Sequence, residues 1–152
     1  MSDASINADD FLRASKALKA AGKTEMRKAL NKELRTAAKP LIPKARAAAL
    51  RLLPSRGGLA KAVSRSPQRV QVRTGQDTAG VRVVVGKRRG SAARAANDGK
   101  VRHPVFGTGV FVEQAVPPGW FDDTMRREGP SVKPAVESAI RDVLDQIARD
   151  GN

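Results

Sequence analysis

The chain has no cysteine, which excludes a disulfide framework and any metal site built from thiolates. Its single histidine, His103, supplies neither a metal site nor a catalytic triad by itself, since a metal centre normally needs three or four protein ligands and a triad needs a nucleophile and an acid beside the histidine. No uncharged apolar run approaches the ~18 residues that span a membrane. The amino-terminal residues also lack the basic and apolar segments of a signal peptide. We therefore expect no metal, no membrane association and one domain spanning residues 1–152.

Groups with catalytic spacing are also missing. Asp122 and Asp123 are adjacent, so on a helix they would point about 100° apart and could not act as an acid–base pair. They are better placed to form ion pairs with Arg126 and Arg127 at helical spacing. The glycines of Gly107-Thr-Gly109 lead into a predicted strand, whereas phosphate-binding glycines precede a helix. We predict that the protein is not an enzyme and takes no cofactor or small molecule.

Aromatic residues are scarce, and four of the five lie in one short segment, residues 102–121. The pattern predicts a β-hairpin, a Pro-Pro-Gly corner and the start of a helix. Large apolar side chains are hardest to replace in a core or at a partner contact. Two interpretations stay open: the aromatics join the sheet to the last helix, or they anchor a neighbouring subunit. The candidate interface or packing anchors are Phe106, Phe111, Trp120 and Phe121.

Positive charge is in excess and unevenly distributed. The formal net charge is +14, and residues 1–100 carry 23 Lys/Arg against 7 Asp/Glu, whereas residues 101–152 carry 6 against 8. This asymmetry indicates a basic half that faces nucleic acid or an acidic protein, or helices coated with solvated Lys and Arg. No aromatic side chains are interleaved with the basic run, and no DNA-reading motif appears, so DNA would be contacted through charge alone. The candidate docking or DNA-proximal residues are Lys87, Arg88, Arg89 and Arg94.

The amino-terminal half is predicted to be a helical arm over residues 10–53. A first helix ends near Gly22, and a longer stretch then keeps apolar residues at spacings of three and four. Pro40 and Pro43 interrupt this stretch, so we expect a kink or a short break there. Pro54 ends the arm.

The middle of the chain is predicted to form strands. Residues 69–73 and 81–85 are β-branched runs that should pair, and a second hairpin is expected within the aromatic segment 101–121. Between them, residues 86–100 lack apolar periodicity and are predicted to be a flexible basic loop. A last amphipathic helix occupies residues 130–150. The predicted fold class is α+β, with a small antiparallel sheet of about four strands and the C-terminal helix packed on that sheet.

The motifs and their order resemble a family of tail-completion or neck proteins of long-tailed phages, related to the lambda minor tail protein Z. The resemblance covers nearly the whole chain. It rests on Leu53-Pro54 and Gly58-Leu59 after a long Ala-rich helix, and on three hairpin motifs: Arg102-His-Pro-Val-Phe-Gly107, Val112-Glu-Gln114 and Val116-Pro-Pro-Gly-Trp-Phe121. The hairpin pattern and the Ala/Arg-rich composition are similar to members from phages of actinobacteria. The chain departs from the family at Gly109-Val-Phe111, where a polar turn and a tryptophan would be expected.

The resemblance implies a structural virion protein at the head–tail junction, assembled in the host cytoplasm. It implies a ring of six copies that completes the head-proximal end of the tail or joins the tail to the capsid connector. The expected neighbours are the head–tail connector, the tail-terminator or tail-tube proteins, and packaged DNA in the channel. Tail-completion, tail-terminator and stopper roles stay open within this class. The alternative function is that of a nucleic-acid-binding protein without sequence specificity, inferred from charge alone.

Overall fold

The computed structural model describes residues 8–73, 80–86, 91–105 and 107–151. The fold class is α+β, as predicted. The contacts gather into two compact units, each built from separated segments of the chain. The helical unit takes the described residues of Asp3–Pro40, Val70–Val83 and Gly129–Asn152, and the hairpin unit takes those of Leu41–Arg69 and Val84–Glu128.

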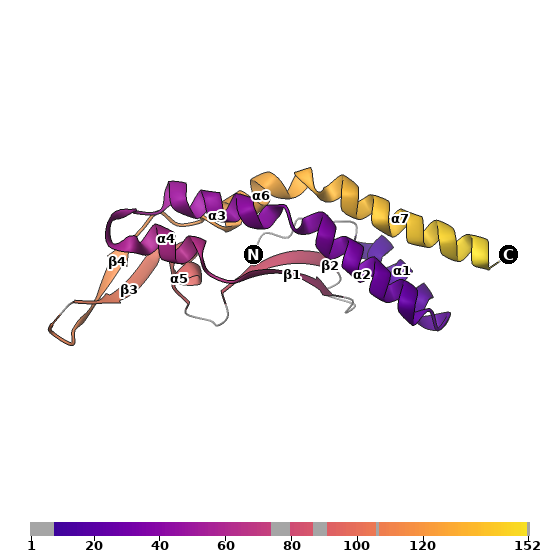
Figure 1. Ribbon diagram of the computed structural model, residues 1–152, viewed down its shortest axis with the longest axis horizontal. Coiled ribbons are helices and arrows are strands. Elements are labelled where there is room, and N and C mark those ends of the chain that lie inside the picture. Colours follow the sequence, from indigo (N-terminus) through magenta and orange to yellow (C-terminus); the bar gives the residue numbers. More distant parts are fainter. Residues whose placement is uncertain (1–7, 74–79, 87–90, 106, 152) are drawn as a thin grey trace. The chain divides into compact units, whose positions relative to one another are not determined.

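Three helices form the core of the helical unit. They are α1 (Ala8–Ala20), α2 (Thr24–Ala38) and α7 (Lys133–Asp150), and both α1 and α2 contact α7 (Figure 1). The predicted helical spacing holds, because each helix turns one apolar stripe inward and leaves its charged residues outside. The buried residues of this core are Phe11, Ala14, Leu18, Leu30, Leu34, Val136, Ala139, Ile140 and Val143.

The turn between α1 and α2 ends the first helix at the predicted glycine. Gly22 has a φ of +66°, a left-handed conformation that glycine adopts without steric cost. The amide of Lys23 then donates to the carbonyl of Leu18 at 2.9 Å, and the amide of Gly22 donates to that of Lys19 at 3.1 Å. These bonds satisfy carbonyls that the helix end would otherwise leave without donors. The Lys23 ammonium also pairs with Asp150 of α7 at 2.6 Å.

The predicted interruption of the long helical stretch lies at Lys39–Pro40. Helix α2 ends at Ala38, and α3 (Leu41–Leu52) begins directly after Pro40. Pro40 has no amide hydrogen to continue the helical ladder, and its ring clashes with the preceding turn. Pro43 lies in the first turn of α3, where an amide has no helical acceptor and its loss costs little. Helix α3 ends before Pro54, as expected.

The four strands do not form one sheet, so that part of the prediction is wrong. In the described residues, β1 (Gln68–Arg73) pairs only with β2 (Gly80–Val85), and β3 (Lys100–Pro104) pairs only with β4 (Phe111–Ala115). The C-terminal helix packs mainly against α1 and α2, and Val72 and Val81 of the first sheet border the same core.

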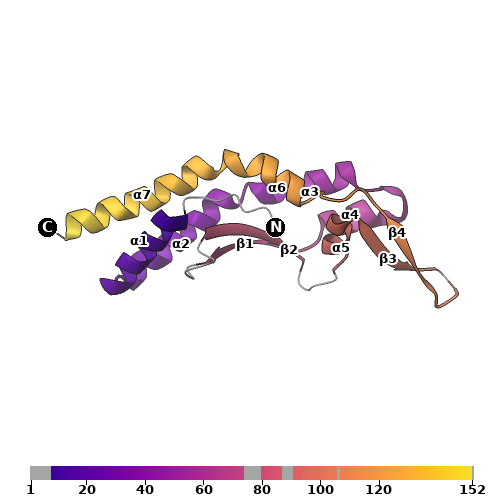
Figure 2. The ribbon, with the colours of Figure 1, turned by 180° about the vertical axis from the view of Figure 1, so that it is seen from behind.

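The hairpin unit combines the second sheet with several helices. Helix α3 packs against α4 (Leu59–Ser64), which follows the short helix η1 (Arg56–Gly58), and against α6 (Asp122–Glu128) (Figure 2). Lys44 of α3 bonds Glu128 of α6 at 2.8 Å, and this bond, with that from Arg127, lowers the pKa of the Glu128 carboxyl. The buried apolar residues are Leu41, Ala45, Ala48, Ala49, Leu53, Ala60, Val63, Val84, Val85, Ala93, Ala96, Val101, Val116, Trp120, Phe121 and Met125.

The predicted flexible loop over residues 86–100 contains a helix, α5 (Ala92–Asp98), so this prediction is also wrong. Ala93 and Ala96 are fully buried, one helical turn apart, and α5 contacts α4 and β3. Sequence periodicity missed the helix because a stripe of alanines carries little hydrophobic signal. Small side chains nonetheless let a short helix lie close against its neighbours, where tertiary packing stabilises it.

A leucine of the helical core should be far more important to stability than an exposed leucine. Leu34 is 0% exposed in α2 and Leu50 is 55% exposed in α3. We expect Leu34→Ala to lower the free energy of unfolding by about 2–5 kcal/mol through lost burial and a residual cavity. The matched change Leu50→Ala should alter it by less than about 0.5 kcal/mol. Urea denaturation followed by circular dichroism measures both; similar losses would contradict the assigned core.

Candidate functional site

The β3–β4 hairpin is the most exposed element of the hairpin unit. Its strands pair antiparallel, with Lys100 opposite Ala115, Arg102 opposite Glu113 and Pro104 opposite Phe111. All five residues of β4 are exposed, and Val101 is the one buried residue of β3. In both views the hairpin extends beyond α3, α4 and α5 (Figures 1 and 2). Two-stranded hairpins are marginally stable alone in water, so this one depends on the contacts at its base.

Apolar side chains concentrate on the outer half of the hairpin. Six large hydrophobic residues are exposed in the part of the chain that the structure describes, and four of them belong to this element. Their exposed fractions are 37% for Val105, 55% for Val110, 53% for Phe111 and 38% for Val112. Exposed apolar groups that gather on one element, unlike single ones, mark an interaction surface.

Polar contacts on one face hold the strands in register. The Arg102 guanidinium carbon lies 4.9 Å from the centre of the Phe111 ring, a cation–π contact across the strands. Lys100 and Glu113 form an ion pair at 3.3 Å on the same face. Since these groups are exposed, each contact contributes at most about 1 kcal/mol. The Arg102 contact leaves about half of the Phe111 side chain available to a partner.

The turn of the hairpin follows the predicted glycine pattern. The amide of Val105 donates to the carbonyl of Val110 at 2.8 Å, and the Thr108 hydroxyl donates to the carbonyl of Val105 at 3.0 Å. Gly107 and Gly109 both have positive φ angles, as a tight turn requires. These contacts define the position of the exposed valines relative to the strands.

The base of the hairpin is closed by a tight approach of two backbone segments. The amide of Val116 donates to the carbonyl of Gly99 at 2.9 Å. Gly99 has a φ of +92°, and a Cβ at this position would lie 3.1 Å from the Cβ of Pro118. Glycine suits this position, because a side chain would be strained at this φ and its Cβ would crowd Pro118. The chain therefore enters β3 directly after α5, and the segment that follows β4 returns to the end of α5.

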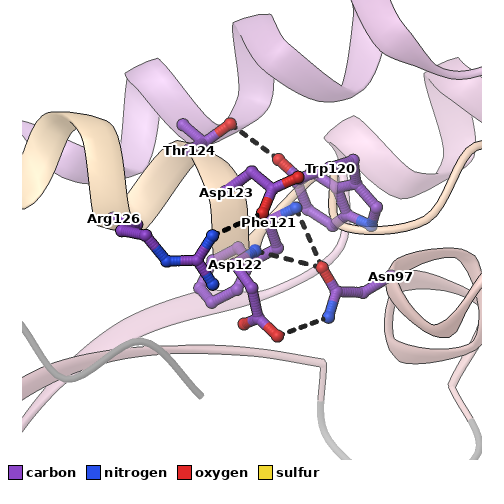
Figure 3. Close-up of polar contacts among 7 residues, drawn as sticks. All are labelled: Asn97, Trp120, Phe121, Asp122, Asp123, Thr124 and Arg126. Atoms are coloured by element: carbon purple, nitrogen blue, oxygen red, sulfur yellow. Dashed lines mark hydrogen bonds and ion pairs between the residues drawn. The ribbon is translucent and has the colours of Figure 1, made fainter.

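Asn97 of α5 joins the returning chain to the start of α6. Its amide oxygen accepts hydrogen bonds from the backbone amides of Phe121 and Asp122, both at 3.0 Å, and its amide nitrogen donates to the Asp122 carboxylate at 2.9 Å (Figure 3). The backbone carbonyl of Asn97 also accepts a hydrogen bond from the backbone amide of Gly119 at 2.8 Å. The oxygen satisfies amides that a helix start leaves without acceptors. Sequence analysis missed this role, because a residue of another helix supplies the cap.

Trp120 completes the same junction from the apolar side. Its ring is 1% exposed, its Nε1–H donates to the carbonyl of Ala93 at 3.0 Å, and it packs edge-on against Phe121 with ring centres 5.4 Å apart. The Thr124 hydroxyl donates to the Trp120 carbonyl at 2.7 Å (Figure 3). A buried indole needs an acceptor for its N–H, and α5 provides one. Trp120 therefore fixes α5 and α6 to each other.

The structure separates the predicted site residues into different environments. Trp120 and Phe121 lie in the core of the hairpin unit, where they position the hairpin, whereas Phe111 is exposed on β4. Arg94 is half-buried in α5 and donates from Nε to the carbonyl of Val85 at 3.1 Å. The prediction placed Arg94 in a flexible basic loop. The structure places it in α5, where its side chain is bonded to the backbone of β2. The remaining predicted residues, Phe106, Lys87, Arg88 and Arg89, lie outside the described residues.

The described residues hold no group of three or more His, Cys, Asp or Glu that could bind a metal ion. His103 is exposed on β3. Asp123 pairs with Arg126 at 2.9 Å, as the helical spacing predicted, and Asp122 is bonded by Asn97. None of the helices in the described ranges is long and apolar enough to cross a membrane. In the part of the chain that the structure describes, the site consists of apolar side chains on a hairpin whose outer strand edges have no strand partner.

Comparison of the chain with protein-family models, curated proteins and solved structures gives no match.

Removal of the Asn97 side chain should weaken the base of the hairpin. We expect Asn97→Ala to lower the free energy of unfolding by about 1–3 kcal/mol, because two amides and the Asp122 carboxylate lose their shared partner. The matched control is Asn31→Ala in α2, where the buried Oδ1 has no hydrogen-bond partner among the described residues, so its removal should be neutral or stabilising. Thermal and urea unfolding measure both variants; equal stabilities would contradict the assigned role of Asn97.

Proposed function

We propose that this chain is a structural protein of a long-tailed phage virion. It acts as a ring subunit that completes the head-proximal end of the tail or joins the tail to the capsid connector. The exposed apolar hairpin is the observation that carries the proposal, because it is held firmly at its base and uncovered at its outer half. In the assembled ring this half would contact a neighbouring subunit.

The geometry of the hairpin suits repeated contacts between copies. A hairpin of one subunit that packs against a different surface of the next makes a heterologous contact, and such contacts close into rings when the rotation permits. Both outer edges of the hairpin lack strand partners in the described part of the chain, so backbone hydrogen bonds can add to apolar burial. In an isolated monomer, the apolar side chains and the outer strand edges of the hairpin have no second subunit to contact.

The resemblance to tail-completion and neck proteins supports the same element. The motifs Arg102-His-Pro-Val-Phe-Gly107 and Val112-Glu-Gln114 fall on the hairpin, and Val116-Pro-Pro-Gly-Trp-Phe121 forms its return to α6. The segment that carries the resemblance is thus the segment with the exposed apolar surface. The partners that follow are neighbouring copies, connector and terminator or tail-tube proteins.

The number of copies in a particle tests the proposal directly. We expect about six copies of the chain per particle of its source phage, because a cyclic ring at the tail axis requires a fixed small number. Quantitative mass spectrometry of purified particles, with the portal protein as the internal standard, measures this ratio. Absence of the chain from particles would overturn the structural role.

The exposed phenylalanine should matter for assembly and not for folding. Because Phe111 is 53% exposed, Phe111→Ser should change the unfolding free energy by less than about 1 kcal/mol and sharply reduce incorporation into particles. The matched control is Gln114→Ser on the same strand, which keeps the apolar surface and should incorporate normally. Complementation of a phage that lacks the gene, with particle counts and melting curves, measures both properties. Normal incorporation of Phe111→Ser would remove the hairpin from the interface.

A further inference from the structure

The longest stretch of the sequence without an acidic residue covers residues 34–76, between Glu33 and Asp77. Within the hairpin unit, Leu41–Arg69 holds seven Lys/Arg and no Asp/Glu. This segment forms α3, η1, α4 and the start of β1. Soluble surfaces usually intersperse both signs of charge, so a run of one sign this long calls for a physical reason.

Six of these cations form what we call the cationic surface: Arg46, Arg51, Arg56, Lys61, Arg65 and Arg69. All six are exposed. The seventh, Lys44, is paired with Glu128 of α6. Among the residues that the structure describes, no carboxylate forms an ion pair with any of the six. Their mutual repulsion is therefore not offset by ion pairs within the described chain.

Four of the six cations belong to a helix pair and the short helix that joins it: Arg46, Arg51, Arg56 and Lys61. Helices α3 and α4 pack side by side (Figures 1 and 2). Their buried residues are mainly small. Arg51 lies in the last turn of α3, Arg56 in η1 and Lys61 in α4, so these three cations gather around the connection between the helices. A ligand that approaches this connection meets positive charge from three consecutive elements.

We propose that the cationic surface binds the phosphate backbone of double-stranded DNA without reading its sequence. Five of its six residues are arginines, whose planar guanidinium can donate two parallel hydrogen bonds to phosphate oxygens. Residues 41–69 contain no aromatic side chain, so the stacking platform that binds single strands is missing from this segment. Duplex DNA needs no such platform, because its backbone presents a dense row of negative charges.

A protein partner fits this surface less well. The centres of protein interfaces are depleted in charged residues and usually combine both signs of charge. The exposed leucines of α3, Leu50 and Leu52, are scattered apolar residues of a kind that most surfaces carry. The surface belongs to the segment from α3 to the start of β1, apart in sequence from the hairpin, so the inference does not rest on the proposed virion role.

Charge-matched variants of the full chain test the proposal. The surface variant carries Arg46→Gln, Arg51→Gln, Arg56→Gln and Lys61→Gln. The control carries Lys16→Gln, Lys32→Gln, Arg141→Gln and Arg149→Gln, four exposed cations of the helical unit. Each variant lowers the formal net charge of +14 by four. Fluorescence anisotropy with a mixed-sequence 20-base-pair duplex, over a series of salt concentrations, gives the affinity and its salt slope.

We expect the wild-type log affinity to fall against log salt with a slope of about −4 to −5, at about 0.9 per phosphate contact. The surface variant should lose about 3 to 4 of that slope and bind roughly 10³–10⁴-fold more weakly at 0.1 M salt, whereas the control should keep a slope within about 1 of the wild type. If the surface variant fails to fold, the pair Arg51→Gln and Arg56→Gln against Lys16→Gln and Lys32→Gln repeats the comparison with half the effect.

Three results would overturn the proposal. Equal losses in the surface and control variants would show that binding follows net charge and not this surface. Wild-type affinity in the surface variant would place any DNA contact elsewhere. Binding of poly-glutamate as tight as that of the duplex, with the same loss in the surface variant, would assign the surface to an acidic protein.

Discussion

The junction between α5 and the start of α6 is the constraint on which the candidate site depends. Asn97 and Trp120 hold residues on either side of the hairpin together, through bonds to the amides of Phe121 and Asp122 and to the carbonyl of Ala93. The intervening chain must therefore leave α5 and return to it. Closing such a loop costs conformational entropy that grows only slowly with its length, so a well-bonded base can support a long projecting hairpin.

In this arrangement, the few aromatic residues of the hairpin unit have different roles. Trp120 and Phe121 are buried and give the base its rigidity, and Phe111 is exposed and presents apolar area on the hairpin. A rigid base lowers the entropy lost when the hairpin docks, because the strands are already ordered. The proposed ring contact uses this property: exposed area supplies affinity, and the buried junction presents it in one orientation.

The two proposals concern different surfaces of the hairpin unit, and each surface would bind its partner through a different kind of interaction. The hairpin offers apolar area and outer strand edges that have no strand partner in the described part of the chain, and both suit a neighbouring protein. The cationic surface offers arginines that form no ion pair with the described carboxylates, and these suit a phosphate backbone. A subunit that contacts protein through one element and DNA through another could serve at a channel through which DNA passes. The Lys44–Glu128 pair shows that the fold can neutralise a cation of the acid-free segment where a carboxylate is in reach.

The sequence by itself determined the helices of the helical unit, the break before Leu41 and the two strand pairs, because their signals are local. Leucines at helical spacing, Pro40 and the Gly107-Thr-Gly109 turn act through neighbouring residues. The stretch without acidic residues, 34–76, is also evident from the sequence. Only the tertiary structure decided that Ala92–Asp98 is a helix, that the strands form separate sheets, and that Trp120 is buried while Phe111 is exposed. These outcomes depend on partners distant in sequence, since an alanine stripe or an aromatic ring carries no local signal of what will cover it.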